Sequence, residues 1–300
     1  MSKTIRLKKG LDIRMEGKPE PHLENSSGSE FYAIKPSEFP GLTPRLSVVQ
    51  GQEVKAGEQL CHDKSFPEIS FVSPVGGVVV AINRGERRKI LEIVVKAEKG
   101  IGNVDFGQAN PLSMEPSAVR ELLLKAGMWP FFRRRPYGIL AKPNETPKSI
   151  FVSAFDSAPL APDNAFVLKG EEKIFQTGLN ALTRLTTGKV HLGLPAGQEH
   201  PCKTMKNVEI TFYQGPHPAG NAGVQIHHTD PVNKGEVVWT ISPQGVLYIG
   251  RLFETGFVDF SKIIALAGSE VKSPCYFRTI CGAGVDSILQ NRLKSNTGVR

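Results

Sequence analysis

The feature of this sequence that most constrains its fold is a change of hydrophobic pattern near residue 100. From Pro36 to Lys99, short Val and Ile runs alternate with glycine turns, for example at Gly51 and Gly57, which is typical of an all-β module. Beyond residue 100, buried apolar runs alternate with segments whose apolar residues recur at helical spacing. Strand, helix and strand in succession form a βαβ unit, so this part predicts an α/β domain with parallel strands.

These patterns divide the chain into four segments. We expect a loop-rich N-terminal segment (1–35, with a loop over 24–30), the β module (36–100), an α/β domain (101–256) and the start of a third unit (257–300). Inside the α/β domain we expect helices over 116–126 and 171–185, and strands over 150–154, 190–194 and 208–212. A strand over 262–267 opens the third unit. The chain then stops without a closing element, so we expect a truncated piece.

Composition and charge narrow the class of protein. No apolar run approaches the roughly 20 residues of a membrane-spanning helix, and no apolar stretch follows the basic N-terminus as in a secretory signal. We therefore expect a protein that stays in the cytoplasm. A net charge of +8 suits an anionic membrane surface or an acidic partner. Nucleic acid is the weaker alternative, because no nucleic-acid-binding motif is found. The run Arg84–Lys89 is predicted to be a solvated hairpin tip, with docking on an acidic partner as the alternative.

Metal and nucleotide motifs are weak. The sequence has four cysteines, and none forms a C-x-x-C pair: Cys61, Cys202, Cys275 and Cys281. An Fe–S cluster or structural zinc is therefore not expected. His227 and His228 would point to opposite faces of an extended segment, so we expect no metal there either. The glycines of Gly215-x4-Gly220-x2-Gly223 do not predict a dinucleotide site, because we expect no helix after them.

Two hairpin motifs in the β module resemble those of biotinyl and lipoyl domains. They are Gly51–Gly57, and Ser73–Val79 with its Pro-Gly turn. Between them lies Lys64, where such domains carry their swinging cofactor. Here Phe66-Pro67 and a longer interval depart from a tight exposed hairpin tip. We therefore expect a barrel-sandwich module that serves as scaffold, with Lys64 unmodified.

A wider set of motifs resembles one protein family. The matching segments lie at 8–20, 127–137, 150–163, 217–220 and 238–256. Together they are similar to the NqrA family, whose members belong to the bacterial Na+-translocating NADH:quinone reductases. The resemblance implies a lipoyl-like barrel, a Rossmann-like α/β domain and the start of a β-grasp-like (SLBB) domain. It also implies a peripheral protein on the cytoplasmic side of the inner membrane, soluble when isolated, bound to other subunits and above all to integral membrane subunits. Those subunits would carry the FAD, 2Fe–2S, FMN and riboflavin.

The same family is similar in plan to the flavin-binding subunit of complex I and to the corresponding subunit of the Rnf electron-transport complex. Those relatives have a G-x-G-G-x-G-F-P loop after the helix that corresponds to 116–126, and its glycines let the backbone approach flavin phosphate. Here the loop is Ala126–Phe132, in which Trp129, Pro130, Phe131 and Phe132 replace the glycines. These side chains prevent such an approach. We therefore expect no cofactor and no catalytic residue on this chain, which would be inactive in isolation.

The aromatic block permits two interpretations. Core packing beside a basic surface is the interpretation that we favour for Trp129, Phe131 and Phe132. The alternative is an apolar slot for a quinone ring, with His217 or an arginine bonded to a carbonyl oxygen. Two functional hypotheses follow: a protein that binds quinone within the complex, or an assembly scaffold without a small ligand.

Overall fold

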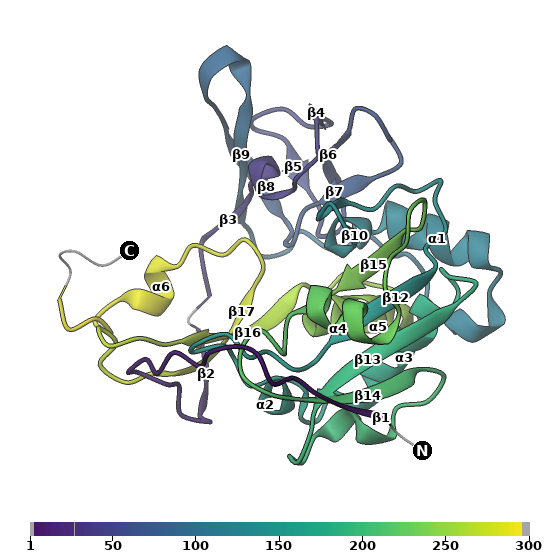
Figure 1. Ribbon diagram of the computed structural model, residues 1–300. Helices are drawn as coiled ribbons and strands as arrows, with labels where there is room; N and C mark the ends of the chain where they lie inside the picture. Colours follow the sequence, from purple (N-terminus) through teal and green to yellow (C-terminus); the bar gives the residue numbers. More distant parts are fainter. Residues whose placement is uncertain (1–2, 27, 296–300) are drawn as a thin grey trace.

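The computed structural model describes residues 3–26 and 28–295. Within these ranges the chain forms one seven-stranded sheet, one four-stranded sheet and two three-stranded sheets. Figure 1 shows the two barrel sheets at the top, the seven-stranded sheet with its helices at the lower right, and the third unit at the left. The helices of the described residues are all too short or too polar to cross a membrane.

The β module is a barrel-sandwich made of two antiparallel sheets. Gly51 and Gly57 adopt φ values of +87° and +88°, which allow the tight turns that flank β5. Val54, Leu60 and Ile93 are buried between the sheets. The fold expected for this region is therefore confirmed. The two strand orders are β3 (Phe31–Ile34), β9 (Ile90–Ala97), β8 (Gly77–Arg84), β5 (Glu53–Val54), and β4 (Pro44–Leu46), β6 (Gln59–Asp63), β7 (Ser70–Val72).

The α/β domain is built on the seven-stranded sheet. Its first five strands pair in parallel, the sixth runs antiparallel to the fifth, and the seventh runs antiparallel to the sixth. The strands that the sequence predicts over 150–154, 190–194 and 208–212 are three adjacent members of this sheet. The sheet order is β1 (Lys3–Arg6), β14 (Glu209–Gln214), β13 (Lys189–Pro195), β12 (Ser149–Ser153), β15 (Val238–Ile241), β10 (Arg133–Arg135), β11 (Ile139–Leu140).

Strand β12 shows why this sheet is buried on both faces. Ile150 and Val152 belong to the main core, whereas Phe151 packs with Ile226 and Val238 on the other side. Alternate residues of a strand point to opposite faces, so a continuous apolar run is expected wherever helices cover both.

Two glycines set the closest helix packing. A Cβ on Gly178 would lie 2.2 Å from the backbone oxygen of Val246, and one on Gly250 would lie 2.0 Å from that of Ile174. The helices α3 and α5 therefore approach backbone to backbone. The α-helices are α1 (Pro116–Lys125), α2 (Asn164–Leu168), α3 (Glu172–Thr183), α4 (Ala222–Thr229), α5 (Pro243–Thr255) and α6 (Asp286–Leu289). Short 3-10 turns cover Pro36–Glu38, Glu86–Arg88, Pro111–Ser113, Trp129–Phe131 and Pro201–Thr204.

The N-terminal segment contributes strands to three different sheets. Strand β1 pairs with β14 in the α/β domain, and β3 pairs with β9 in the barrel. The third strand, β2 (Leu23–Asn25), pairs with β17 (Cys275–Ile280), which also pairs with β16 (Ser261–Leu266). The loop expected over 24–30 is therefore wrong at its start, because a strand of the third unit recruits these residues. The segment joins the three units together.

Three helices of the α/β domain were not predicted: the short α2, and α4 and α5. The helix α4 carries His227 and His228, so the expectation of an extended segment there is wrong. The helix α5 follows β15 and is buried along most of its length. Gly245 and Gly250 interrupt the apolar pattern of this segment, so its periodicity did not predict a helix.

Candidate functional site

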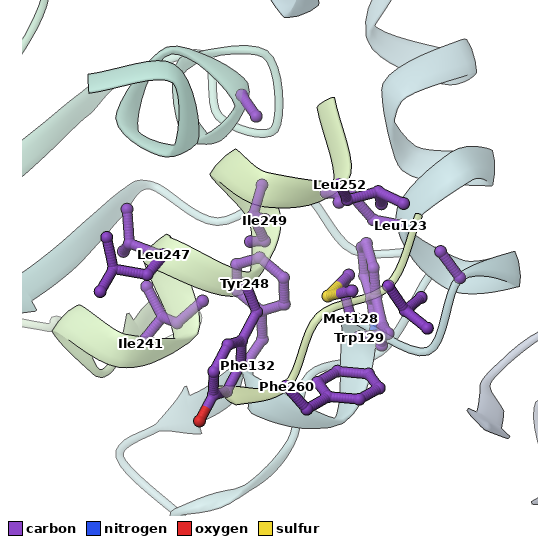
Figure 2. Close-up of a cluster of buried hydrophobic side chains, with 14 of the residues drawn as sticks. Leu123, Met128, Trp129, Phe132, Ile241, Leu247, Tyr248, Ile249, Leu252 and Phe260 are labelled. Atoms are coloured by element: carbon purple, nitrogen blue, oxygen red, sulfur yellow. The ribbon is translucent and has the colours of Figure 1, made fainter. Parts of the chain in front are cut away.

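Trp129 and Phe132 are core residues. Both side chains are fully buried, and their rings lie 5.4 Å apart, in contact with the ring of Trp239. The indole Nε1 of Trp129 donates a hydrogen bond to the backbone oxygen of Ala141 at 2.8 Å. Figure 2 shows Trp129 beside Met128 and Leu123, and Phe132 near Tyr248 in the same buried cluster. Their faces are taken by protein, which leaves no room at either for a ligand.

Phe131 lies differently, because its side chain is only partly buried and lines a cavity. This cavity of about 450 Å³, which we call the junction cavity, lies where the barrel, the α/β domain and the third unit meet. Its apolar wall includes Ile34, Phe39, Phe71, Phe131, Phe260 and Ile264. A volume of this size and an apolar lining are typical of small-molecule sites.

A few polar groups face the same cavity. Lys35, Glu38, Lys262 and Thr279 line it, together with Cys281. The hydroxyl of Tyr248 lies 3.1 Å from the Cys281 Sγ, and burial raises the pKa of Tyr248, so this phenol stays protonated. The lysine ammonium groups are the strongest hydrogen-bond donors at the rim.

His217 lies apart from the aromatic block. It follows β14, and its Nδ1 is 3.1 Å from the Ser157 Oγ, while its backbone N–H donates to Asp12 Oδ1 at 2.9 Å. His217 is not among the residues that line the junction cavity. The structure therefore separates His217 from Phe131, and both from the buried pair.

The loop at Ala126–Phe132, where the sequence resemblance led us to look for a flavin loop, is filled by protein. Gly127 has a φ of +71°, and a Cβ there would lie 2.6 Å from Val72 of the barrel. Met128 and Pro130 are buried on either side of Trp129. Gly127 thus allows the α/β domain to pack closely against the barrel.

Lys64 is exposed in the connection between β6 and β7. The preceding Asp63 is buried, and its Oδ1 accepts a hydrogen bond from the N–H of Thr43 at 3.1 Å. Phe66 packs against the core, which draws the connection toward the barrel. These contacts hold the residues beside Lys64 in a shape that differs from a free hairpin tip.

The cysteines and histidines form no evident metal site in the described ranges, where no three groups of the His, Cys, Asp and Glu types cluster suitably. Burial raises the pKa of Cys61 to about 12, and burial together with Glu172 raises that of Cys202 to about 12, so both stay neutral thiols. His227 and His228 are exposed neighbours on α4. Their rings lie 4.9 Å apart and nearly perpendicular, so the reason given against a shared ion, opposite faces of an extended segment, is wrong.

The glycine motif after β14 has the strand–loop–helix context that the sequence did not predict. The loop from Gly215 leads into α4, whose first turn contains Gly223. Gly220 fits closely against β12 and its following loop: a Cβ there would lie 2.4 Å from the N of Ser157. The reason given against a ligand at this loop is therefore wrong. A second cavity, of about 660 Å³, opens beside it, and we call it the strand-end cavity.

Three family models match the chain in succession. They are the NqrA N-terminal barrel-sandwich hybrid domain over 5–98, the NqrA second alpha/beta domain over 114–258 and the NqrA C-terminal domain over 263–300. The chain belongs to the NqrA family. The resemblance inferred from the sequence motifs is thus confirmed, as is the fold class with its SLBB part.

Curated NqrA relatives match over almost the whole chain. Their names describe each as the A-type subunit of a Na(+)-translocating NADH-quinone reductase. The protein from Neisseria meningitidis is 38% identical over 96% of this chain, and that from Photorhabdus laumondii is 39% identical over 97%. The chain spans 65% of the length of these two relatives. A solved NAD+-reducing [NiFe]-hydrogenase matches 60% of this chain and 40% of its own, at 10% identity and a TM-score of 0.41.

Proposed function

We propose that this chain acts as a peripheral, cofactor-free subunit of a Na+-translocating NADH:quinone reductase and binds quinone in the junction cavity. Its place is the cytoplasmic side of the inner membrane, against the integral membrane subunits, while FAD, 2Fe–2S, FMN and riboflavin reside on other subunits. Membership of the NqrA family supports the proposal that the chain is part of such a reductase complex. The single observation that supports quinone binding is the position of Phe131 in an apolar cavity of about 450 Å³.

The chemistry of the cavity wall suits a quinone head group. Phe39, Phe71 and Phe131 offer aromatic faces and edges against which a flat ring can pack. Lys262 reaches the same space and has no carboxylate within 4.0 Å among the ion pairs of the described residues. An ammonium or the Thr279 hydroxyl can donate a hydrogen bond to a quinone carbonyl oxygen. In this arrangement Trp129 and Phe132 support the cavity from the core, and His217 is not needed for binding.

The test is a titration of the purified chain with a short-chain ubiquinone, monitored by isothermal calorimetry. We expect saturable binding that Phe131→Ala and Lys262→Gln each weaken at least about tenfold. The matched control is Phe257→Ala, since Phe257 is 38% exposed and does not line the cavity. Absence of saturable binding, or equal losses in Phe131→Ala and Phe257→Ala, would refute quinone binding by this cavity.

A pure assembly scaffold is the second candidate, and one observation favours it. Every second residue of a short N-terminal stretch is an exposed apolar side chain: Leu11 is 71%, Ile13 61% and Met15 56% exposed. Exposed apolar clusters mark protein or membrane contacts. We expect replacement of all three by serine to abolish co-purification with the membrane subunits from the native host, while the melting temperature of the chain stays unchanged. Retained co-purification would remove this stretch from the interface.

A further inference from the structure

The three consecutive arginines of β10 point to two different sides of the sheet. Strand β10 pairs with β15, with Arg133 opposite Thr240 and Arg135 opposite Val238. Alternate residues of a strand share a face, so Arg134 lies on the other one. There its Nε bonds Glu145 Oε2 at 2.7 Å. Arg134 is thus neutralised, whereas its two neighbours are directed to the strand-end cavity.

Arg133 and Arg135 have few partners. Arg133 donates to the backbone oxygen of Pro130 at 3.3 Å and lies over the ring of Phe39, and Arg135 donates to Thr240 Oγ1 at 3.4 Å. Neither takes part in an ion pair within 4.0 Å among the described residues. Burial and the charge of Arg135 lower the pKa of Arg133, which reflects two half-buried cations without a counter-charge. Each guanidinium has five N–H donors, so most of them remain available.

The cavity that these arginines line lies at the carboxyl ends of β12 and β15. Strand β12 is flanked by β13 on one side and β15 on the other, so the chain reverses its direction of travel across the sheet at this point. Ligands of open α/β sheets bind at such a switch point. The helices α4 and α5 both begin at the same cavity, through Asn221 and Ser242.

Of the two helix starts, that of α4 is open. Ser242 caps α5 by accepting a hydrogen bond from the N–H of Gly245, whereas Asn221 makes no side-chain cap for α4. The backbone carbonyl of Asn221 accepts hydrogen bonds from the N–H groups of Val224 and Gln225. The earlier N–H groups of a first helical turn have no intrahelical acceptor, and they attract anions. A Cβ on Gly223 would meet nothing within 4 Å, so the space beside this residue of the first turn is open.

Two carboxylates also line the cavity, and neither neutralises the arginines. Asp156 is exposed, and its Oδ1 accepts the N–H of Ala158 at 2.9 Å, within its own loop. Glu38 is exposed at the opposite wall, which the junction cavity shares. The remaining wall includes apolar side chains, among them Phe39, Phe131 and Phe155.

We propose that the strand-end cavity binds an organic phosphate, with the phosphate between Arg133, Arg135 and the first turn of α4, and the organic part against Phe155 and Phe131. A phosphate monoester carries about −1.5 to −2 charges at neutral pH, which matches two arginines. A guanidinium group can donate two parallel hydrogen bonds to two oxygens of one phosphate. The cavity volume of about 660 Å³ exceeds the need of inorganic phosphate and accommodates a nucleotide-sized molecule.

This site adjoins the proposed quinone site, but its two arginines are not part of the quinone site. The two cavities share Glu38, Phe39, Pro130 and Phe131, but the arginines belong to the strand-end cavity alone. A variant of Arg135 therefore tests the phosphate site without touching the quinone site. Either proposal can fail while the other holds.

The experiment uses isothermal calorimetry on the chain 1–300 with adenosine 5′-monophosphate, and with adenosine as the uncharged comparison. We expect saturable binding of the nucleotide, at least about tenfold weaker binding of adenosine, and displacement by inorganic phosphate. Arg133→Gln and Arg135→Gln each weaken binding at least about tenfold, whereas Arg134→Gln, on the same strand but facing Glu145, leaves it unchanged. Equal affinity for nucleotide and adenosine, no saturable binding, or an equal loss in Arg134→Gln overturns the proposal.

A second pair of variants separates binding from folding. Gly223→Ala adds only a methyl group in open space and should keep the affinity. Gly223→Asp puts a carboxylate at the first turn of α4, where a negative charge stabilises the helix but repels a phosphate. We expect an unchanged or higher melting temperature together with at least about tenfold weaker nucleotide binding. Unchanged nucleotide affinity in a folded Gly223→Asp protein contradicts the site.

Discussion

Replacement of Trp129 tests whether the aromatic block is core or ligand slot. In the folded chain the indole is fully buried between Phe132 and Trp239, under the guanidinium of Arg120. Its Nε1 satisfies the buried backbone oxygen of Ala141. Trp129→Ala therefore removes both a large packed volume and a buried hydrogen bond.

The expected magnitude follows from these two losses. Truncation of a buried Trp to Ala costs about 3–5 kcal/mol of unfolding free energy, because the surrounding residues only partly fill the cavity. Trp129→Phe keeps most of the packing but leaves the Ala141 oxygen without its donor, which costs about 1–3 kcal/mol. We expect Trp129→Ala to be the more destabilising of the two by roughly 2 kcal/mol.

The assay is urea unfolding followed by far-ultraviolet circular dichroism, which does not depend on either tryptophan as a probe. The control is Tyr137→Ala, since Tyr137 is 71% exposed, and it should change the unfolding free energy by less than about 1 kcal/mol. Similar transition midpoints for Trp129→Ala and Tyr137→Ala would refute the assignment of this indole to the core. A quinone affinity that falls in a folded Trp129→Phe protein, with stability unchanged, would restore the slot interpretation.

Three further outcomes follow from particular contacts. Gly178→Ala should lower the unfolding free energy by about 1–3 kcal/mol in the same urea assay, since its Cβ would meet the backbone of α5; a neutral result would contradict the backbone-to-backbone crossing. Burial raises the pKa of Asp230, but hydrogen bonds from Lys148 and Ser149 lower it overall, so this carboxylate adds stability above pH about 4 that is lost as the pH falls further. Lys148→Gln should reduce the fall in melting temperature between neutral and acid pH. A pH profile equal to that of the unchanged protein would show that the Lys148–Asp230 pair does not contribute to stability. The intact mass of the chain from its native host should show Lys64 unmodified, and an added lipoyl or biotinyl mass would contradict this.

Much of the fold was predictable because its determinants are local. Gly51 and Gly57 permit turns that other residues disfavour, and the strand periods around them specify the barrel. The helical spacing in α1 and α3 likewise follows from neighbours in sequence. The helix α4 escaped prediction because its only buried positions are Gln225 and Ile226, too few to form an apolar stripe.

The candidate sites were less predictable, because they depend on contacts between distant segments. Nothing in the sequence separates Phe131 from Trp129 and Phe132, yet only Phe131 reaches a cavity, since three units meet at its side chain. The sequence likewise does not reveal that His217 bonds Ser157, or that Arg133 and Arg135 face the start of α4.

The sequence alone thus determined the family, the order of the folds and the bulky composition of the loop Ala126–Phe132. The tertiary structure alone decided which aromatic residue is accessible, where strands β1, β2 and β3 pair, and which arginines lack a counter-charge. The physical reason is that backbone conformation depends mainly on neighbours along the chain. Accessibility and charge compensation depend instead on residues that the fold brings together.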